Sequence, residues 1–217
     1  MEDPFLNVDD QSILDEVRKR VSSPIAELIE KKKEEFISVG RSSKERLFEE
    51  LCFCILAANT SAEMGLKTQN YIRYSGFATM PQEELSRELK SCKYRFYNVR
   101  SRFISDSRWI IDELPELIRS TDKAGVREYL VVNVPGIAFK EASHFLRNVG
   151  IFDFAILDKH ILSILKKEFP GRPIKVNSKY WYLETEKLFI DLSRNISMEP
   201  GILDLYLWEI ATGKIIK

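Results

Sequence analysis

The sequence has few cysteines, and this scarcity excludes several classes of protein. Three of the 217 residues are cysteine, an odd number that argues against a framework of disulfides. Cys52 and Cys54 stand two apart in a helical pattern, so their side chains point to different faces and cannot share a metal ion. With Cys92 alone elsewhere, we expect no zinc or iron–sulfur site and no cofactor.

Long apolar runs are also missing, and neither sign of charge is in excess. The longest apolar stretches, such as LCFCILAA, are far too short to span a bilayer, so we expect no membrane partner. The first ten residues, MEDPFLNVDD, are acidic where a secretory signal is basic, which predicts a cytoplasmic protein. Since 33 Lys and Arg residues balance 33 Asp and Glu residues, any nucleic-acid site must be local.

The sequence carries almost no strand signal. No run of strand length alternates apolar and polar residues, whereas apolar residues recur at spacings of three and four along most of the chain. We therefore predict an all-α fold. The first three helical patterns begin near Ile13, Ile25 and Leu47. Further helices are predicted at about 62–74, 82–91, 96–113, 122–132, 140–149, 159–169, 178–195 and 201–211.

The segment PGRPIKVN, residues 170–177, is the strongest interruption of this pattern. Its two prolines and one glycine forbid a continuous helix, although a chain return inside a compact bundle needs the same residues. We favour a single domain, residues 1–217, made of two interleaved helical subdomains, rather than two independent domains. Both termini are expected to pack on the same side, with a cleft between the subdomains.

Residues 134–150, VPGIAFKEASHFLRNVG, place a tight turn between two helices, within a motif that spans about 122–150. A Pro-Gly turn that opens directly into a helix points backbone N–H groups outward, which suits an anion such as phosphate. A plain connection between two helices is the commoner alternative. The first-turn lysine, Lys140, is unexpected because the helix dipole favours lysine at the other end.

The Pro-Gly turn, Lys140 and the AILDKH segment resemble the helix-hairpin-helix DNA glycosylase superfamily, in which a lysine and a later aspartate are catalytic. Asp158 follows the lysine by 158 − 140 = 18 residues, which agrees with that superfamily. One departure is Ala138, which stands where the hairpin usually has a second glycine. Further blocks resemble one branch, the archaeal-type 8-oxoguanine DNA glycosylase/AP lyases: ILAANTSA, KYRFYN, KEASHFLRNVG and the ending YLWEIATGKIIK.

The resemblance implies roles for residues around the hairpin. Lys140 is implied as the nucleophile, and Asp158 as the carboxylate that stabilises positive charge on the sugar and helps proton transfer. Gly136 and Ala138 are implied to hold DNA phosphate through their backbone, and His160 to contact a second phosphate. Taken without the resemblance, Asp158 is an ordinary helix N-cap and His160 a structural or surface histidine.

A lysine suits this chemistry. The enzyme must flip the damaged nucleotide out of the duplex to reach its anomeric carbon. An uncharged amine can displace the base there, form a Schiff base with the opened sugar and permit β-elimination of the 3′ phosphate. One side chain can therefore serve both the glycosylase and the lyase steps.

Two further segments carry DNA-binding hypotheses. Residues 90–103 hold five basic and no acidic residues among aromatics, and we predict that Arg100 and Arg102 contact phosphates while Phe96 stacks on the flipped base. A solvated helix face over buried aromatics is the alternative. Asn59, in the AANTSA turn, matches the residue that the superfamily inserts into the vacated duplex space; otherwise it is an ordinary residue near a helix C-terminus.

The final helix and the chain end are predicted to complete the base pocket. Trp208 could sandwich the base against Phe96. Oxidation converts N7 of guanine from an acceptor into an N–H donor, so discrimination needs a fixed acceptor. The resemblance implies that Lys217 lies nearby, where its ammonium or the terminal carboxylate favours the oxidised base; a frayed terminus is the alternative.

We therefore expect a base-excision repair enzyme that acts as a monomer on double-stranded DNA containing 8-oxoguanine. Two alternatives stay open: the same chemistry on another damaged base, and a non-catalytic helix-hairpin-helix DNA-binding module.

Overall fold

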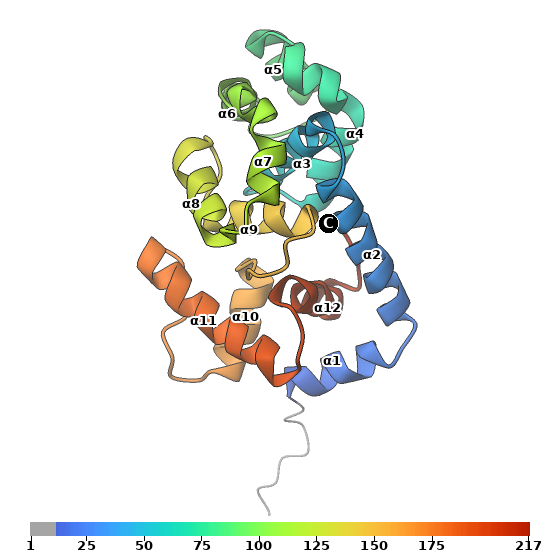
Figure 1. Cartoon of the computed structure of the whole chain (residues 1–217), viewed down its shortest axis with the longest axis vertical. Helices are drawn as coiled ribbons and strands as arrows, with labels where there is room; N and C mark the ends of the chain where they lie inside the picture. The colour runs from blue at the N-terminus through green and yellow to red at the C-terminus, as the bar shows by residue number, and fades with distance from the viewer. Residues whose placement is uncertain (1–11) are drawn as a thin grey trace, which may run out of the picture.

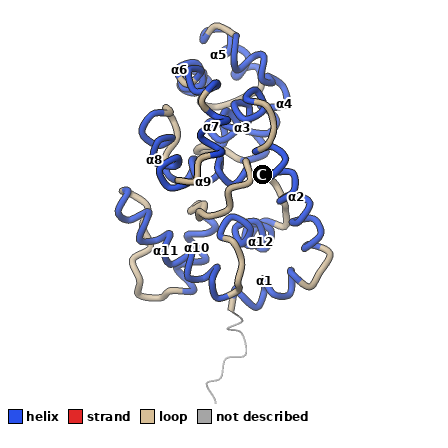
Figure 2. The backbone as a smooth tube through the Cα atoms, viewed as in Figure 1, coloured by secondary structure: helices blue, strands red, loops and turns tan. Residues whose placement is uncertain are grey.

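The computed structural model describes residues 12–217, which fold into helices joined by loops (Figure 1). These residues contain no strand (Figure 2), which confirms the predicted all-α class. The segment MEDPFLNVDD, on which the cytoplasmic prediction rests, lies outside the described residues. No helix between residues 12 and 217 is long and apolar enough to cross a membrane.

The helices follow one another along the chain with one 3-10 helix, η1, among them. They are α1 (Ile13–Val21), α2 (Ile25–Gly40), α3 (Lys44–Ala57), α4 (Ala62–Thr79), α5 (Gln82–Ser91), α6 (Tyr97–Asp106), η1 (Arg108–Asp112), α7 (Leu114–Arg119), α8 (Lys123–Asn133), α9 (Phe139–Asn148), α10 (Lys159–Glu168), α11 (Lys179–Asn195) and α12 (Pro200–Thr212).

Most predicted helices are confirmed within a few residues, and the main difference lies at 96–113. That stretch is divided into α6 and η1, and the short α7, which was not predicted, follows it. The side chain of Arg108 donates to the backbone carbonyls of Phe77, at 2.8 Å, and Met80. These bonds hold the start of η1 against the end of α4, so a long-range contact ends the helix where the local pattern would continue it.

Two hydrophobic cores divide the helices between them (Figure 1). The first is built around α3 and gathers α4 to α8 with the apolar face of α9. The second gathers α1 and α2 with α10, α11 and α12, so helices from both ends of the described chain pack together. The chain enters the first core after α2 and returns to the second after α9, so the two cores are interleaved. That residues 1–217 form a single domain stays a prediction.

The loop of residues 170–177 joins α10 to α11, and its Ile174 packs against the second core. The hydroxyl of Thr185 in α11 donates to the carbonyl of Lys175 at 2.7 Å and accepts its backbone N–H at 3.1 Å. These bonds fasten the loop to the following helix. Of the two interpretations of this segment, a chain return fits the structure.

A buried ion pair joins the two cores beside α9. Arg127 of α8 donates to both carboxylate oxygens of Glu186 in α11, at 2.6 and 2.9 Å. Glu186 also accepts the backbone N–H of Ala155 at 3.1 Å. Both charged side chains are almost fully buried, so each is stable there only while it has its partner.

Replacing Arg127 by alanine should therefore lower the free energy of unfolding by about 3–5 kcal/mol, because Glu186 would be left as an uncompensated buried charge. Urea unfolding measures this loss. Lys187→Ala, which removes an exposed partner of Glu184 on the same helix, is the matched control and should change stability by less than about 0.5 kcal/mol. Equal effects of the two substitutions would contradict the structural role of the buried pair.

Candidate active site

A cavity lies between the two cores, where α9, the start of α10, α12 and the chain end meet. Its wall combines charged and aromatic side chains. The lining residues are Ala57, Thr60, Ala62, Lys140, His144, Arg147, Ile156, Asp158, Asp204, Trp208, Ile216 and Lys217. Lys140, Asp158, Trp208 and Lys217, all predicted site residues, are thereby brought to one place.

The hairpin before α9 depends on glycine at one position only. Gly136 has φ 82°, and a Cβ there would lie 2.5 Å from the ring of Phe103 and 2.9 Å from Nη1 of Arg100. Ala138 is different: it is exposed and extended, with φ −105° and ψ −175°, a conformation that any residue adopts. Alanine in place of the usual second glycine therefore leaves this backbone unstrained.

Arg100 does not lie where the sequence placed it. Its side chain is 7% exposed, its Nη2 donates to the carbonyl of Ala58 at 3.0 Å, and its guanidinium lies over the ring of Phe103. Arg100 supports the hairpin from inside, and this burial counts against its predicted phosphate contact. Arg102 is exposed on the same helix, so the phosphate hypothesis rests on Arg102.

Lys140 is the second residue of α9 and borders the cavity. Its Nζ lies 3.0 Å from Oε1 of Glu141, and its side chain is one-third exposed. Oε2 of Glu141 accepts the backbone N–H of Ala138 at 3.3 Å. Glu141 thus caps the start of α9 and at the same time holds the lysine ammonium at the rim of the cavity.

Asp158 is the N-cap of α10, and it also lines the cavity. Its Oδ1 accepts the backbone N–H groups of His160 and Ile161 at 2.8 and 2.9 Å. Its Oδ2 makes no hydrogen bond with any residue between 12 and 217. The N-cap and the cavity-facing carboxylate, which the sequence left as alternatives, are therefore two uses of one side chain.

The remaining predicted residues lie at different distances from the cavity. Trp208 lines it, with the ring of His160 edge-on at 5.1 Å between centroids. Phe96 does not line it; it is half-buried at the start of α6 with Arg95 over its ring. Asn59 is exposed at φ 60° in the turn between α3 and α4, which also supplies cavity residues. The predicted sandwich of the base between Phe96 and Trp208 stays a prediction.

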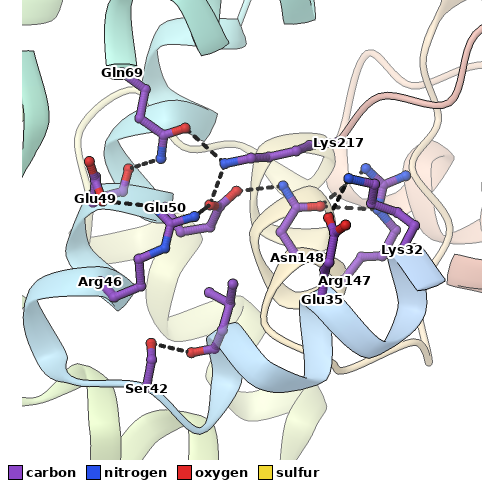
Figure 3. Close-up of polar contacts among 11 residues, drawn as sticks. Lys32, Glu35, Ser42, Arg46, Glu49, Glu50, Gln69, Arg147, Asn148 and Lys217 are labelled. Carbon is purple, nitrogen blue, oxygen red and sulfur yellow. Dashed lines mark hydrogen bonds and ion pairs between the residues drawn. The ribbon is translucent and has the colours of Figure 1, made fainter. Parts of the chain in front are cut away.

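The chain end is anchored by the lysine side chain itself (Figure 3). Nζ of Lys217 donates to Glu50 at 2.7 Å and to Gln69 at 2.8 Å, and lies 4.7 Å from the ring centre of Phe53. Glu50 is nearly inaccessible to solvent and also accepts a 2.7 Å bond from Asn148. The ammonium is therefore engaged by α3 and α4.

Sequence reasoning missed Asp204 of α12 and its partner Arg147 of α9. Both are buried, they form a hydrogen-bonded ion pair, and both line the cavity. Burial raises the pKa of Asp204 to about 7; the Asp158 carboxylate adds to this rise and Arg147 opposes it. The sequence does single out Asp204, because it is the one charged residue in the apolar stretch GILDLYLW. This pattern does not identify Arg147 as its partner.

Arg147 extends this pair into a longer network. Its Nε and Nη2 donate to Oδ1 of Asn148 at 3.2 and 3.1 Å, and Asn148 donates to Glu50. We call this set of side chains the tail network, and its members are, in order, Lys217, Glu50, Asn148, Arg147 and Asp204. It connects the chain end to the cavity through the buried interior.

The comparisons with known proteins agree on one family. A family model described as 8-oxoguanine DNA glycosylase matches residues 29–198. An 8-oxoguanine DNA glycosylase/AP lyase from Thermoplasma acidophilum is 52% identical over 214 residues, which cover 99% of this chain and 97% of the relative. An 8-oxoguanine DNA glycosylase/AP lyase from Methanocaldococcus jannaschii is 40% identical over 207 residues, which cover 94% of this chain and 99% of the relative.

Solved structures give the same result. The 8-oxoguanine DNA glycosylase of Thermotoga maritima matches with a TM-score of 0.89 and 39% identity, over 94% of this chain and 98% of that one. A second match is the 8-oxoguanine glycosylase/lyase of Methanocaldococcus jannaschii, which was solved in complex with a 15mer DNA containing 8-oxoguanine. Its TM-score is 0.90 and its identity 39%, over 94% of this chain and 99% of that one.

The hairpin generates a test in which a matched glycine serves as the control. Gly171 has the same φ as Gly136, 82°, but nothing lies within 4 Å of a Cβ built on it. Gly171→Ala should cost only about 1–2 kcal/mol for the left-handed backbone. Gly136→Ala should cost about 1–3 kcal/mol more, because its methyl group overlaps Phe103 and Arg100. Urea unfolding of both variants measures the two losses. Equal losses would contradict close packing under the hairpin.

Proposed function

The chain belongs to the 8-oxoguanine DNA glycosylase family, and on that premise we propose that Lys140 is the amine that attacks the damaged nucleotide. The chain is a bifunctional DNA glycosylase and AP lyase of base-excision repair. It removes 8-oxoguanine and cleaves the abasic strand that results. This rejects the alternative of a non-catalytic DNA-binding module.

One observation carries the assignment: Lys140 and Asp158 come from different helices and line the same cavity. The flipped nucleotide enters this cavity with its anomeric carbon toward Lys140. The neutral amine forms a bond to that carbon while the bond to the base breaks, and the base leaves with the electron pair and takes up a proton. The C1′–O4′ bond of the sugar then breaks to give a Schiff base, which permits β-elimination of the 3′ phosphate. The ammonium must first leave Glu141 and give up its proton.

Asp158 stabilises the positive charge that develops on the sugar. Its Oδ1 is fixed by two backbone N–H groups, so its Oδ2 can be directed at the substrate without a change of rotamer. The capping bonds keep the carboxylate in place before the substrate arrives. Fixed charge of this kind needs no reorganisation during the reaction.

The terminal carboxylate of Lys217 is proposed as the acceptor that distinguishes 8-oxoguanine from guanine. Its ammonium is already bound by Glu50 and Gln69, so it serves as the anchor of the chain end. Only the oxidised base carries an N–H donor at N7, and a carboxylate left unpaired by normal guanine would be penalised by about 1–3 kcal/mol.

Double-stranded DNA containing 8-oxoguanine is the proposed partner, bound across the hairpin and the cavity mouth. The backbone at Gly136 and Ala138 and the side chain of His160 contact phosphates, and Asn59 fills the vacated space in the duplex. Arg102 adds a further phosphate contact. A role for Phe96 against the flipped base, a monomeric state and a cytoplasmic location stay predictions.

Lys140→Gln should abolish both base release and borohydride trapping, because glutamine has no amine to form a Schiff base, while lesion DNA still binds. Single-turnover excision, trapping and a binding titration measure the three properties. Lys159→Gln is the control: this exposed lysine follows Asp158 but does not line the cavity, so excision and trapping should persist. Trapping by the Lys140 variant would contradict the assignment.

Arg102→Ala should weaken binding of lesion and undamaged duplexes alike, since an interaction with phosphate carries no sequence information. The slope of log K against log salt should become shallower by about 0.9, because the variant neutralises one phosphate fewer. Binding titrations at several salt concentrations measure it. An unchanged slope would mean that Arg102 faces solvent in the complex.

Extending the chain by one glycine after Lys217 should narrow the preference for 8-oxoguanine over guanine. The extension keeps the anchored ammonium but moves the terminal carboxylate away, so the discrimination should weaken by about 1–3 kcal/mol. Single-turnover rates on both bases measure the preference, and trapping on a preformed abasic site is the control that should not change. Identical preferences with and without the extension would exclude the carboxylate.

A further inference from the structure

Glu141 touches the proposed nucleophile, yet no chemical step has been assigned to it. Its Oε1 lies 3.0 Å from Nζ of Lys140, and Lys140 pairs with no other carboxylate among residues 12–217. Neighbouring residues of a helix do not face each other, so this contact forms only because Glu141 turns back over the start of α9. There its Oε2 accepts the backbone N–H of Ala138 at 3.3 Å.

A capping role accounts for only one oxygen of Glu141. Oε2 serves the hairpin, whereas Oε1 has no partner in the described part of the chain other than Lys140. Glu141 is 8% exposed, and a buried carboxylate needs a positive charge or hydrogen-bond donors beside it. Oε1 is therefore held against the nitrogen to which the sugar becomes bonded.

The charge on that nitrogen changes during the reaction. The ammonium of Lys140 loses its proton before the attack, and the protonated Schiff base that follows is positively charged again. Glu141 then regains a cationic partner at Nζ, as it has in the free enzyme. In the Schiff base, C2′ of the sugar is bonded to the carbon that Nζ holds, so an oxygen beside Nζ is also close to the hydrogens on C2′.

We propose that Glu141 is the base of the lyase step, its Oε1 taking a proton from C2′ of the opened sugar once Lys140 has formed the Schiff base. The positive nitrogen of the Schiff base makes this proton more acidic. The C2′–H bond breaks and its electron pair forms the C2′–C3′ double bond, while the C3′–O bond breaks and the 3′ phosphate leaves with the electron pair of that bond. Glu141 afterwards returns the proton to solvent, and water hydrolyses the Schiff base.

The other carboxylates of the site are engaged elsewhere. Oδ1 of Asp158 is fixed by two backbone N–H groups, and its Oδ2 is proposed for the charge that develops as the base leaves. Asp204 is paired with Arg147. The inference rests on the proposed function and assigns a different carboxylate to each reaction, Asp158 to base release and Glu141 to strand cleavage.

Glu141→Gln tests the proposal, because glutamine keeps an oxygen for the N–H of Ala138 but has no basic oxygen. On a duplex with a preformed abasic site, where no released base can take the proton, strand cleavage should slow by about 100-fold or more. Borohydride trapping on that duplex and single-turnover release of 8-oxoguanine should not slow, since both precede loss of the C2′ proton. Glu184→Gln, which changes a glutamate paired with Lys187 on the surface, is the matched control and should alter none of the three rates.

Two further measurements distinguish a base from a residue that only holds the lysine. Deuterium in place of the C2′ hydrogens should slow cleavage by Glu141→Gln at least as much as cleavage by the wild type, because proton removal limits the rate of the variant. In Glu141→Ala, added formate should restore part of the cleavage rate without changing trapping, since a small carboxylate can occupy the space that the side chain leaves.

The outcomes separate this inference from the proposed function. Cleavage by Glu141→Gln at the wild-type rate would overturn the inference, and so would equal losses of cleavage and trapping, or no rescue by formate. Urea unfolding checks that the variants fold, and if Glu141→Gln does not, Glu141→Ala with formate decides the question. Failure of the wild type to trap an abasic site would instead overturn the role of Lys140.

Discussion

The tail network is the interaction on which the rest of the site depends. Its buried side chains connect the chain end, α3, α9 and α12. Because an unpaired charge in the interior is strongly unfavourable, the network has one satisfied arrangement, and that arrangement fixes these four segments together. Since α9 also carries Lys140 in its first turn, the same set of contacts positions Lys217 and the proposed nucleophile.

Two helix starts supply Lys140 and Asp158, the groups proposed to react, and both starts use backbone N–H groups that a helix leaves unpaired. At α9, Glu141 accepts the N–H of Ala138 and holds the ammonium of Lys140. At α10, Asp158 accepts two N–H groups and keeps one oxygen for the cavity. The positive end of a helix suits both the carboxylate and the DNA phosphates outside, so one local geometry serves positioning and binding.

The all-α class and most helix bounds could be predicted because apolar periodicity and capping are local properties of the sequence. The Pro-Gly turn and the two helix starts were found for the same reason, whereas the roles of Lys140 and Asp158 were implied by the resemblance to the glycosylase superfamily. The burial of Arg100 was not foreseen, because its guanidinium bonds to the carbonyl of Ala58, which is distant in sequence. The break at η1 was missed for the same reason, since Arg108 bonds to the end of α4.

By itself, the sequence determined the class of fold, the Pro-Gly turn and the helix starts that carry Lys140 and Asp158, since each depends on residues close together along the chain. Only the tertiary structure decided which buried charges face one another. The pairing of Asp204 with Arg147 spans 57 residues, and that of Lys217 with Glu50 spans 167. Asp204 and Lys217 come to line the same cavity only because folding removes each from water and leaves a particular partner within reach.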